Sequence, residues 1–261
     1  TMRFMKKNMK ILFLGVLMAV TSCSFTTKEF NDPDKDKVLL DLITYVLEKG
    51  HYSPADMDDT FSAGVYDDFI NALDPLKRYF IASDIEEFSA YRTLIDDQIK
   101  AKDLTFFNLV YDRFMKRMEE GKKRYAAVLE EPFDYSIDEV INVDYENLAY
   151  VKNESEMKDR WRQQLKFSTL SNYYDLVEEK EVSAKNQKEV AEKGEEFTPS
   201  ENAKLTISEI EEKSRTQTRT SLEEYYEFTD DLERKDYFAT FLTTIVEEFD
   251  PHTNYFAPPD R

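Results

Sequence analysis

Three features of this 261-residue chain have residue types that could support chemistry: one serine–lysine pair and two histidines. Ser155 and Lys158 have the S-x-x-K spacing, in which a lysine can serve as general base for a serine nucleophile. Such a lysine must be desolvated, but the surrounding "NESEMKDR" is strongly charged, so we interpret the pair as a chance match. His51 and His252 lie far apart and outside any HExxH or CxxC setting, which leaves a metal site unsupported.

Other catalytic signatures are absent from the sequence. There is no GxSxG, no P-loop and no GxGxxG. Close carboxylate pairs are frequent, but in so acidic a chain they indicate a solvated surface. We therefore predict no catalytic residue, no metal and no cofactor in this chain.

The charge balance limits the choice of partner. The formal net charge is −19, which repels phosphate backbones and argues against a nucleic-acid partner. The 16 tyrosines and 19 phenylalanines offer rings for base stacking, but core packing explains them better.

The amino terminus has the pattern of a targeting signal. In "MKKNMKILFLGVLMAVTSC" a basic start precedes an apolar run over 11–20, too short for a stable membrane span and suited to a signal peptide. The run ends in "VTSC", which resembles the lipobox of bacterial lipoproteins and implies lipidation of Cys23. We expect a signal peptide over 1–22, a tether over 23–35 and a lipid-anchored, periplasm-facing protein of the bacterial envelope. An ordinary signal peptide that carries a cysteine near its cleavage point is the alternative.

Apolar residues recur at helical spacing along the rest of the chain, and no convincing alternating strand is present, which predicts an all-α fold. Residues 178–204 have little to bury and are interpreted as a solvated helix or a mobile polar insertion. The predicted stripes include those formed by Val38, Leu42, Tyr45 and Val46; by Phe61, Val65, Phe69 and Leu73; by Phe106, Phe107, Val110, Phe114 and Met118; and by Phe238, Phe241, Leu242, Ile245, Val246 and Phe249.

Local signals predict where some helices begin and end. Ser83 with Glu86, and Asn153 with Glu156, have the spacing of helix starts. Gly50 is a candidate helix stop.

A pattern occurs twice, as "LDPLKRYF" over 73–80 and "FDPHTNYF" over 249–256. Proline disfavours helical geometry in the residue before it, so Asp74 and Asp250 are predicted at or beyond helix ends. The following Tyr–Phe pairs are predicted to fold back and bury their rings. Two similar helix terminators and a duplicated unit both remain open as explanations.

The second occurrence, "FDPHTNYFAPPDR", resembles the junction that precedes the PDZ domain in the carboxy-terminal-processing peptidases, the tail-specific protease family. "LDPLKRYFIASDIEEFSAYRTLIDD" resembles the helical amino-terminal region of the same family, and "YFATFLTTIVEEFDPHTNYF" resembles the closing helix of that region. The order and spacing of these segments agree with the family over roughly residues 36–261. It implies a periplasmic serine peptidase with a Ser/Lys dyad, which recognises protein or peptide substrates by their carboxy-terminal tails. The residues that match the junction signature are Asp250, Pro251, His252, Thr253, Tyr255 and Phe256.

The resemblance also implies that the PDZ and catalytic domains lie beyond these residues, so no catalytic residue is assigned and the junction is interpreted as structural. We expect the amino-terminal, non-catalytic part of such a peptidase. The alternative is a complete non-catalytic helical lipoprotein that acts as an adaptor or docking protein.

Overall fold

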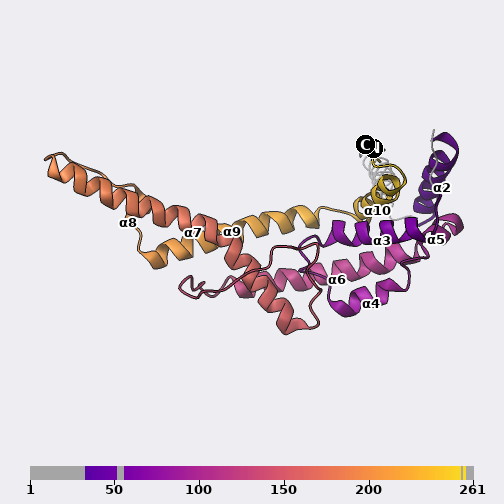
Figure 1. Cartoon of the computed structure of the whole chain (residues 1–261), viewed down its shortest axis with the longest axis horizontal. Coiled ribbons are helices and arrows are strands. Elements are labelled where there is room, and N and C mark those ends of the chain that lie inside the picture. Colours follow the sequence, from indigo (N-terminus) through magenta and orange to yellow (C-terminus); the bar gives the residue numbers. More distant parts are fainter. Residues whose placement is uncertain (1–32, 52–55, 254, 257–261) are drawn as a thin grey trace, which may run out of the picture. The chain divides into compact units, whose positions relative to one another are not determined.

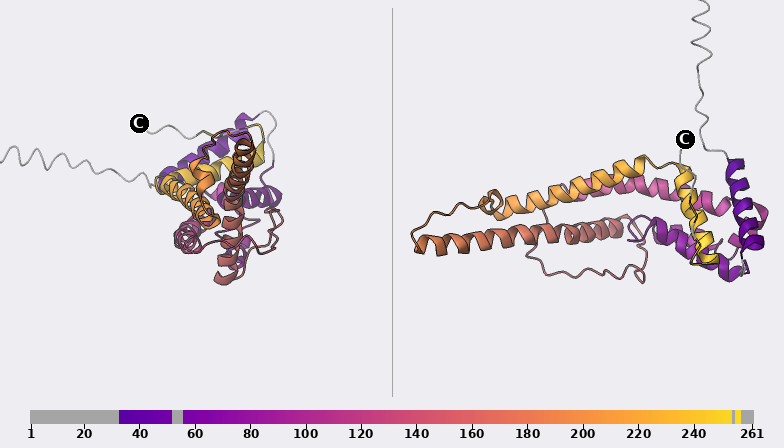
Figure 2. Two further views of the ribbon diagram at one scale, coloured as in Figure 1. Left: turned by 90° about the vertical axis from the view of Figure 1, so that its left-hand side faces the viewer. Right: turned by 90° about the horizontal axis from the view of Figure 1, so that it is seen from above.

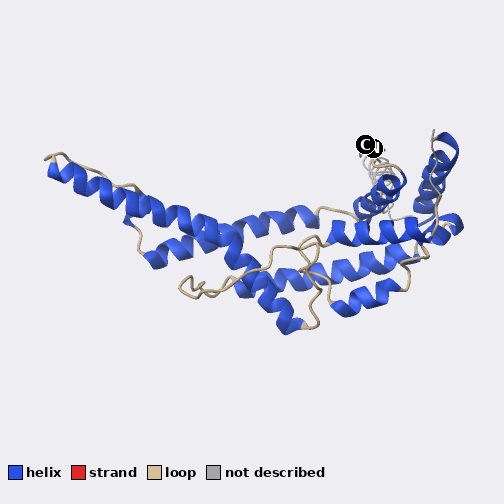
Figure 3. Cartoon of the chain, in the orientation of Figure 1, coloured by secondary structure: helices blue, strands red, loops and turns tan. Residues whose placement is uncertain are grey.

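The computed structural model describes residues 33–51, 56–253 and 255–256, and all of these after Pro33 belong to one compact unit. Within them the chain forms nine α-helices and no strand, which confirms the all-α prediction (Figures 1 and 3). In chain order they are α2 (Pro33–Gly50), α3 (Asp59–Leu73), α4 (Ala82–Ser89), α5 (Ile95–Ala101), α6 (Thr105–Val128), α7 (Glu154–Glu192), α8 (Glu201–Lys204), α9 (Ile207–Asp230) and α10 (Arg234–Phe249).

Side-chain caps fix several helix starts. The Asn153 side chain accepts a hydrogen bond from the Glu156 N–H at 3.0 Å, so the predicted start of α7 is confirmed. The prediction from Ser83 and Glu86 was wrong by two residues, because Asp84 accepts the Ile81 N–H at 3.1 Å and α4 already begins at Ala82. The carboxylate of Asp84, inside the helix, satisfies the Ile81 N–H, and the S-x-x-E pattern takes no account of an aspartate at this position.

The core is aromatic and lies where α3, α6 and α10 meet. Phe69, Phe107 and Phe241 come from these three helices, and the ring of Phe241 lies 5.0 Å from that of Phe69 and 5.5 Å from that of Phe107. All three rings are buried, and inclined contacts of this kind add to the stabilisation that burial provides. The helical stripes of α3, α6 and α10 thus face this core as predicted.

α7 and α9 run side by side, and α8 packs on α7 (Figure 2). At the buried contact Thr169 and Thr218 share a hydrogen bond of 2.7 Å. The predicted polar segment 178–204 is helical up to Glu192 and again in α8, and Lys180 donates hydrogen bonds to the carbonyls of Ala203 and Leu205. Its first half is therefore a solvated helix.

The first stripe was predicted wrongly. Leu40 and Leu47 face the core, whereas the four stripe residues are 54% to 67% exposed: Val38, Leu42, Tyr45 and Val46. The periodicity of α2 is helical as predicted, but its broader apolar face lacks a cover among the described residues.

The predicted membrane attachment concerns the amino-terminal residues, and membrane spanning concerns the helices. The expected signal peptide over 1–22, Cys23 and most of the tether over 23–35 lie outside the described residues. Among the helices that the structure describes, none combines the length and apolar character needed to cross a bilayer.

Candidate functional site: the junction and the loop between α6 and α7

The first Asp-Pro pattern builds a buried carboxylate cap at the end of α3. Asp74 is 1% exposed and accepts hydrogen bonds from the N–H groups of Arg78, Tyr79 and Phe80 at 2.8, 3.0 and 2.9 Å. Burial raises the pKa of the Asp74 carboxyl, and the three N–H donors oppose that rise. The cap turns the chain so that Tyr79 and Phe80 pack into the core, as predicted.

The second pattern builds a similar cap at the end of α10, but nearer the surface. Asp250 accepts hydrogen bonds from the His252 N–H at 3.0 Å and the Thr253 hydroxyl at 3.1 Å, and its other contacts are the two imidazoles, His51 at 2.9 Å and His252 at 3.2 Å. The His252 N–H and the His51 side chain hold the pKa of Asp250 well below its usual range. Both Asp residues thus follow helix ends, as predicted.

The two Tyr–Phe pairs differ. Tyr255 is partly buried against the core, but Phe256 is 85% exposed, so the predicted burial of the second phenylalanine is wrong within the described chain. The first pair is covered by α7, where Trp161 lies 5.8 Å from Tyr79 and donates to the Arg78 carbonyl at 2.8 Å. At the junction, no described element covers Phe256 in this way.

The contacts at the junction connect two helices and indicate a structural role. The His252 side chain is 92% exposed, and within the described chain His252 contacts Asp250 through its N–H and its imidazole. Pro251 lies in the exposed turn that follows. The cluster joins the last helix to α2 through His51, and among the described residues no group of His, Cys, Asp and Glu side chains could hold a metal ion.

Ser155 and Lys158 are both exposed on the first turns of α7. No hydrogen bond joins them within the described part of the chain, and Asn153 with Glu156 organises this helix start instead. A solvated lysine is a poor general base, so the structure places no catalytic pair here.

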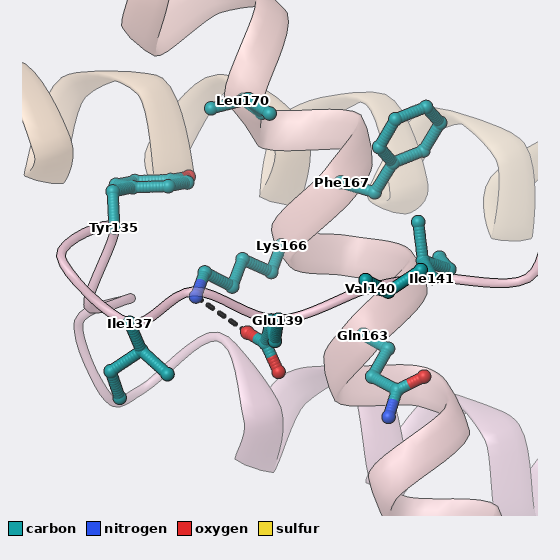
Figure 4. Close-up of a pocket in the computed structure, with 9 residues that line it drawn as sticks. All are labelled: Tyr135, Ile137, Glu139, Val140, Ile141, Gln163, Lys166, Phe167 and Leu170. Carbon is teal, nitrogen blue, oxygen red and sulfur yellow. Dashed lines mark hydrogen bonds and ion pairs between the residues drawn. The ribbon is translucent and has the colours of Figure 1, made fainter.

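Sequence reasoning missed a groove between α7 and the long loop from α6 (Figure 4). Its volume is about 160 Å³, and its walls carry Ile137 and Val140 from the loop and Phe167 and Leu170 from α7. All four side chains are at least 40% exposed. The available signal was "SIDEVINV" over 136–143, a β-branched, apolar run in a chain otherwise patterned for helices.

An ion cluster fixes the floor of this groove. Glu139 accepts hydrogen bonds from Arg162 at 2.8 and 3.1 Å. It also accepts one from Lys166 at 2.5 Å, which Figure 4 shows. These two cations lower the pKa of Glu139 to about 2. The loop is therefore held against α7 by a carboxylate that stays ionised at neutral pH.

Comparison with known proteins confirms the family that the resemblance predicted. A family model described as the tail specific protease N-terminal domain matches residues 43–259. A tail-specific protease of Haemophilus influenzae is 26% identical over 213 residues, which cover 81% of this chain. The matched region spans about a quarter of that relative, 26% of its length. The chain belongs to the family of tail-specific protease N-terminal domains.

Proposed function

We propose that the chain is the amino-terminal, non-catalytic part of a periplasmic, lipid-anchored carboxy-terminal-processing serine peptidase. The observation that carries the proposal is the family match over residues 43–259, which includes both Asp-Pro patterns in order. The relative's name describes a protease, and the share of its length outside the match leaves room for further domains.

In this proposal the helical unit supports the domains that follow the junction. Asp250 fixes the direction of the chain at the end of α10, and its bond to His51 ties that exit to α2. A PDZ domain placed there would bind the carboxy-terminal tails of protein or peptide substrates, and a Ser/Lys dyad further along would cleave them.

The anchor is proposed on Cys23. Its support is local to the sequence: a basic start, a short apolar run and small residues directly before the chain's one cysteine. The partners expected are thus substrate polypeptides and a membrane, and nucleic acid is not among them.

The test uses the parent gene with its natural leader, expressed in a bacterial envelope. Cleavage of a periplasmic reporter that carries an apolar carboxy-terminal tail, and no cleavage when the tail is replaced by an acidic one, is the expected result. Cys23→Ser is expected to move the protein from the membrane fraction to the soluble periplasm with cleavage retained. A parent protein that leaves both reporters intact contradicts the peptidase proposal, and unchanged fractionation contradicts the anchor.

A second candidate function is a complete adaptor lipoprotein, and the exposed face of α2 favours it. Exposed apolar patches on soluble domains mark interaction surfaces. Pull-down from envelope extracts with the 261-residue chain, compared with a Leu42→Ser, Val46→Ser variant, separates the candidates. The adaptor is favoured if the wild type retains a partner that the variant loses and the parent protein shows no peptidase activity.

A further inference from the structure

The loop between α6 and α7 contains a stretch of unpaired main chain. Residues 138–143, named here the edge segment, pass along α7 without a turn (Figure 4). Within the described chain, none of their main-chain N–H or C=O groups has a hydrogen-bond partner in the protein. Extended chain with free N–H and C=O groups is the template on which another strand adds.

The residue types of the edge segment favour the same conformation. Val140, Ile141 and Val143 are β-branched, which suits extended backbone and disfavours helix. Val140 is 88% exposed and Val143 is 53% exposed, so the stretch is not held extended by burial of these two side chains. Apolar side chains in this position remain available to a partner.

The groove beside the edge segment has room for a side chain. Its volume of about 160 Å³ is close to that of a cavity of roughly 150 Å³ that holds a benzene ring. Phe167 and Leu170, 50% and 40% exposed, form one wall. A strand added along the edge segment would place alternate side chains over this wall.

The negative charge around the edge segment favours a positively charged partner. From Tyr125 to Val151 the chain has seven acidic residues and no lysine or arginine. Glu139 is neutralised by Arg162 and Lys166, but Asp134, Asp138 and Asp144 have no ion pair among the described residues. The surface along the extended chain is therefore negative and complements a cationic segment.

The segment is held in place before any partner binds. Glu139 is fixed to α7, and beyond the segment Lys77 donates to the carbonyls of Glu146 and Leu148 at 2.8 Å each. Arg160 donates to the Ala149 carbonyl at 2.8 Å. Binding would then cost little ordering of the loop, since both of its ends are already bonded.

We propose that the edge segment binds an extended, basic and apolar polypeptide segment as an added strand, with one apolar side chain in the groove. This inference rests on the proposed function in one respect: the polypeptide would be a substrate of the parent peptidase. Binding itself is a property of the helical unit and is tested without cleavage.

The test is fluorescence anisotropy with the purified chain and a labelled octapeptide that alternates lysine with valine or leucine. Saturable binding is expected, with little binding of a peptide that alternates glutamate with the same apolar residues. A peptide with N-methylated main-chain nitrogens at alternate positions is expected to bind about tenfold more weakly, because it cannot complete the strand ladder.

Protein variants probe the strand directly. Val140→Pro and Val143→Pro remove N–H groups on opposite edges of the extended chain, and neither group has a partner in the free protein. At least one of them must weaken binding by about tenfold, whereas Val140→Thr, which keeps the N–H, must not. Phe167→Ser is expected to weaken binding, and Phe228→Ser, an exposed phenylalanine on α9, is the matched control.

Three outcomes overturn the proposal: equal binding of the acidic peptide, no effect of either proline, or self-association of the chain that Val140→Pro abolishes. Unchanged circular dichroism of the proline variants shows that lost binding is not unfolding. Absent binding together with tail-dependent cleavage by the parent protein removes this inference alone. Normal binding with no cleavage by the parent protein removes the proposed function alone.

Discussion

His51 and Asp250, 199 residues apart, lie side by side, with the imidazole Nε2 2.9 Å from the carboxylate Oδ2. The contact joins the end of α2 to the cap of α10, and the His51 ring also meets Phe249 edge-on at 5.5 Å. An ion pair between Asp36 and Arg234 joins the starts of the same two helices. α2 is therefore held at both ends while its apolar stripe stays exposed.

His51→Ala is expected to loosen α2 and leave α10 protected, because α10 keeps its packing on α3 and α6. Hydrogen exchange by mass spectrometry checks this: peptides of α2 should exchange faster, and those of α10 should not change. Asp41→Ala is the control, since its pair with Lys102 is exposed on both sides and contributes little. Unchanged exchange in α2 would show that the junction does not hold this helix.

The two Asp-Pro caps are expected to differ in their contribution to stability. Asp74→Ala leaves two buried N–H groups and one partly buried N–H group without an acceptor, so the free energy of unfolding should fall by about 3 kcal/mol or more. Asp250→Ala should cost much less, because water replaces the lost acceptor. Urea unfolding followed by fluorescence of Trp161, which is buried, measures both, and equal losses would contradict the distinction.

Two helical glycines are expected to respond oppositely to alanine. A Cβ on Gly121 would lie 2.7 Å from the Tyr226 hydroxyl and 2.9 Å from the Tyr79 ring, so Gly121→Ala should destabilise by about 1–3 kcal/mol. At Gly64 the added Cβ meets the Glu248 carboxylate, the far end of a flexible side chain.

Glu248 gains by moving outward, because burial raises its pKa and nearby carboxylates add to the rise. Gly64→Ala should therefore be neutral or stabilising by up to about 1 kcal/mol, from the greater helix propensity of alanine. Thermal unfolding of the two variants checks the contrast. If Gly64→Ala lowered stability as much as Gly121→Ala, the Glu248 side chain would be unable to rotate away from the added Cβ.

The ion cluster of the groove predicts a pH dependence. The pKa of Glu139 is about 2 in the folded chain against a usual 4.5, so its ionised form stabilises the folded state. This contribution is fully present above about pH 4.5 and is lost as the pH falls towards 2. Melting temperatures of wild type and Glu139→Gln should thus differ at neutral pH and converge in acid. Asp138→Asn, at a residue with no ion pair among those described, should show no such convergence.

Much of the fold follows from local sequence. Periodic apolar residues predicted the helices, and Asn153 with Glu156 predicted the start of α7, because a cap needs groups only three residues apart. The two Asp-Pro patterns likewise predicted two helix ends. The family followed from the same patterns in order.

The groove could not be predicted in this way. Glu139 lies 23 residues from Arg162 and 27 from Lys166, so the cluster depends on how the loop returns to α7. The β-branched residues of the run 140–143 favour extended backbone, but the sequence held no local sign that the main chain there would stay unpaired in the described structure.

The sequence by itself therefore determined the helices, the cap at Asn153 and the two Asp-Pro turns, since each depends on residues within one or two turns of one another. Only the tertiary structure decided which cap is buried and which face of α2 is covered. Asp74 is enclosed because α7 brings Trp161 over the turn that follows it, whereas Phe256 and the stripe at Leu42 receive no such cover in the described chain. The physical reason is that burial depends on partners far along the chain, which a local pattern does not encode.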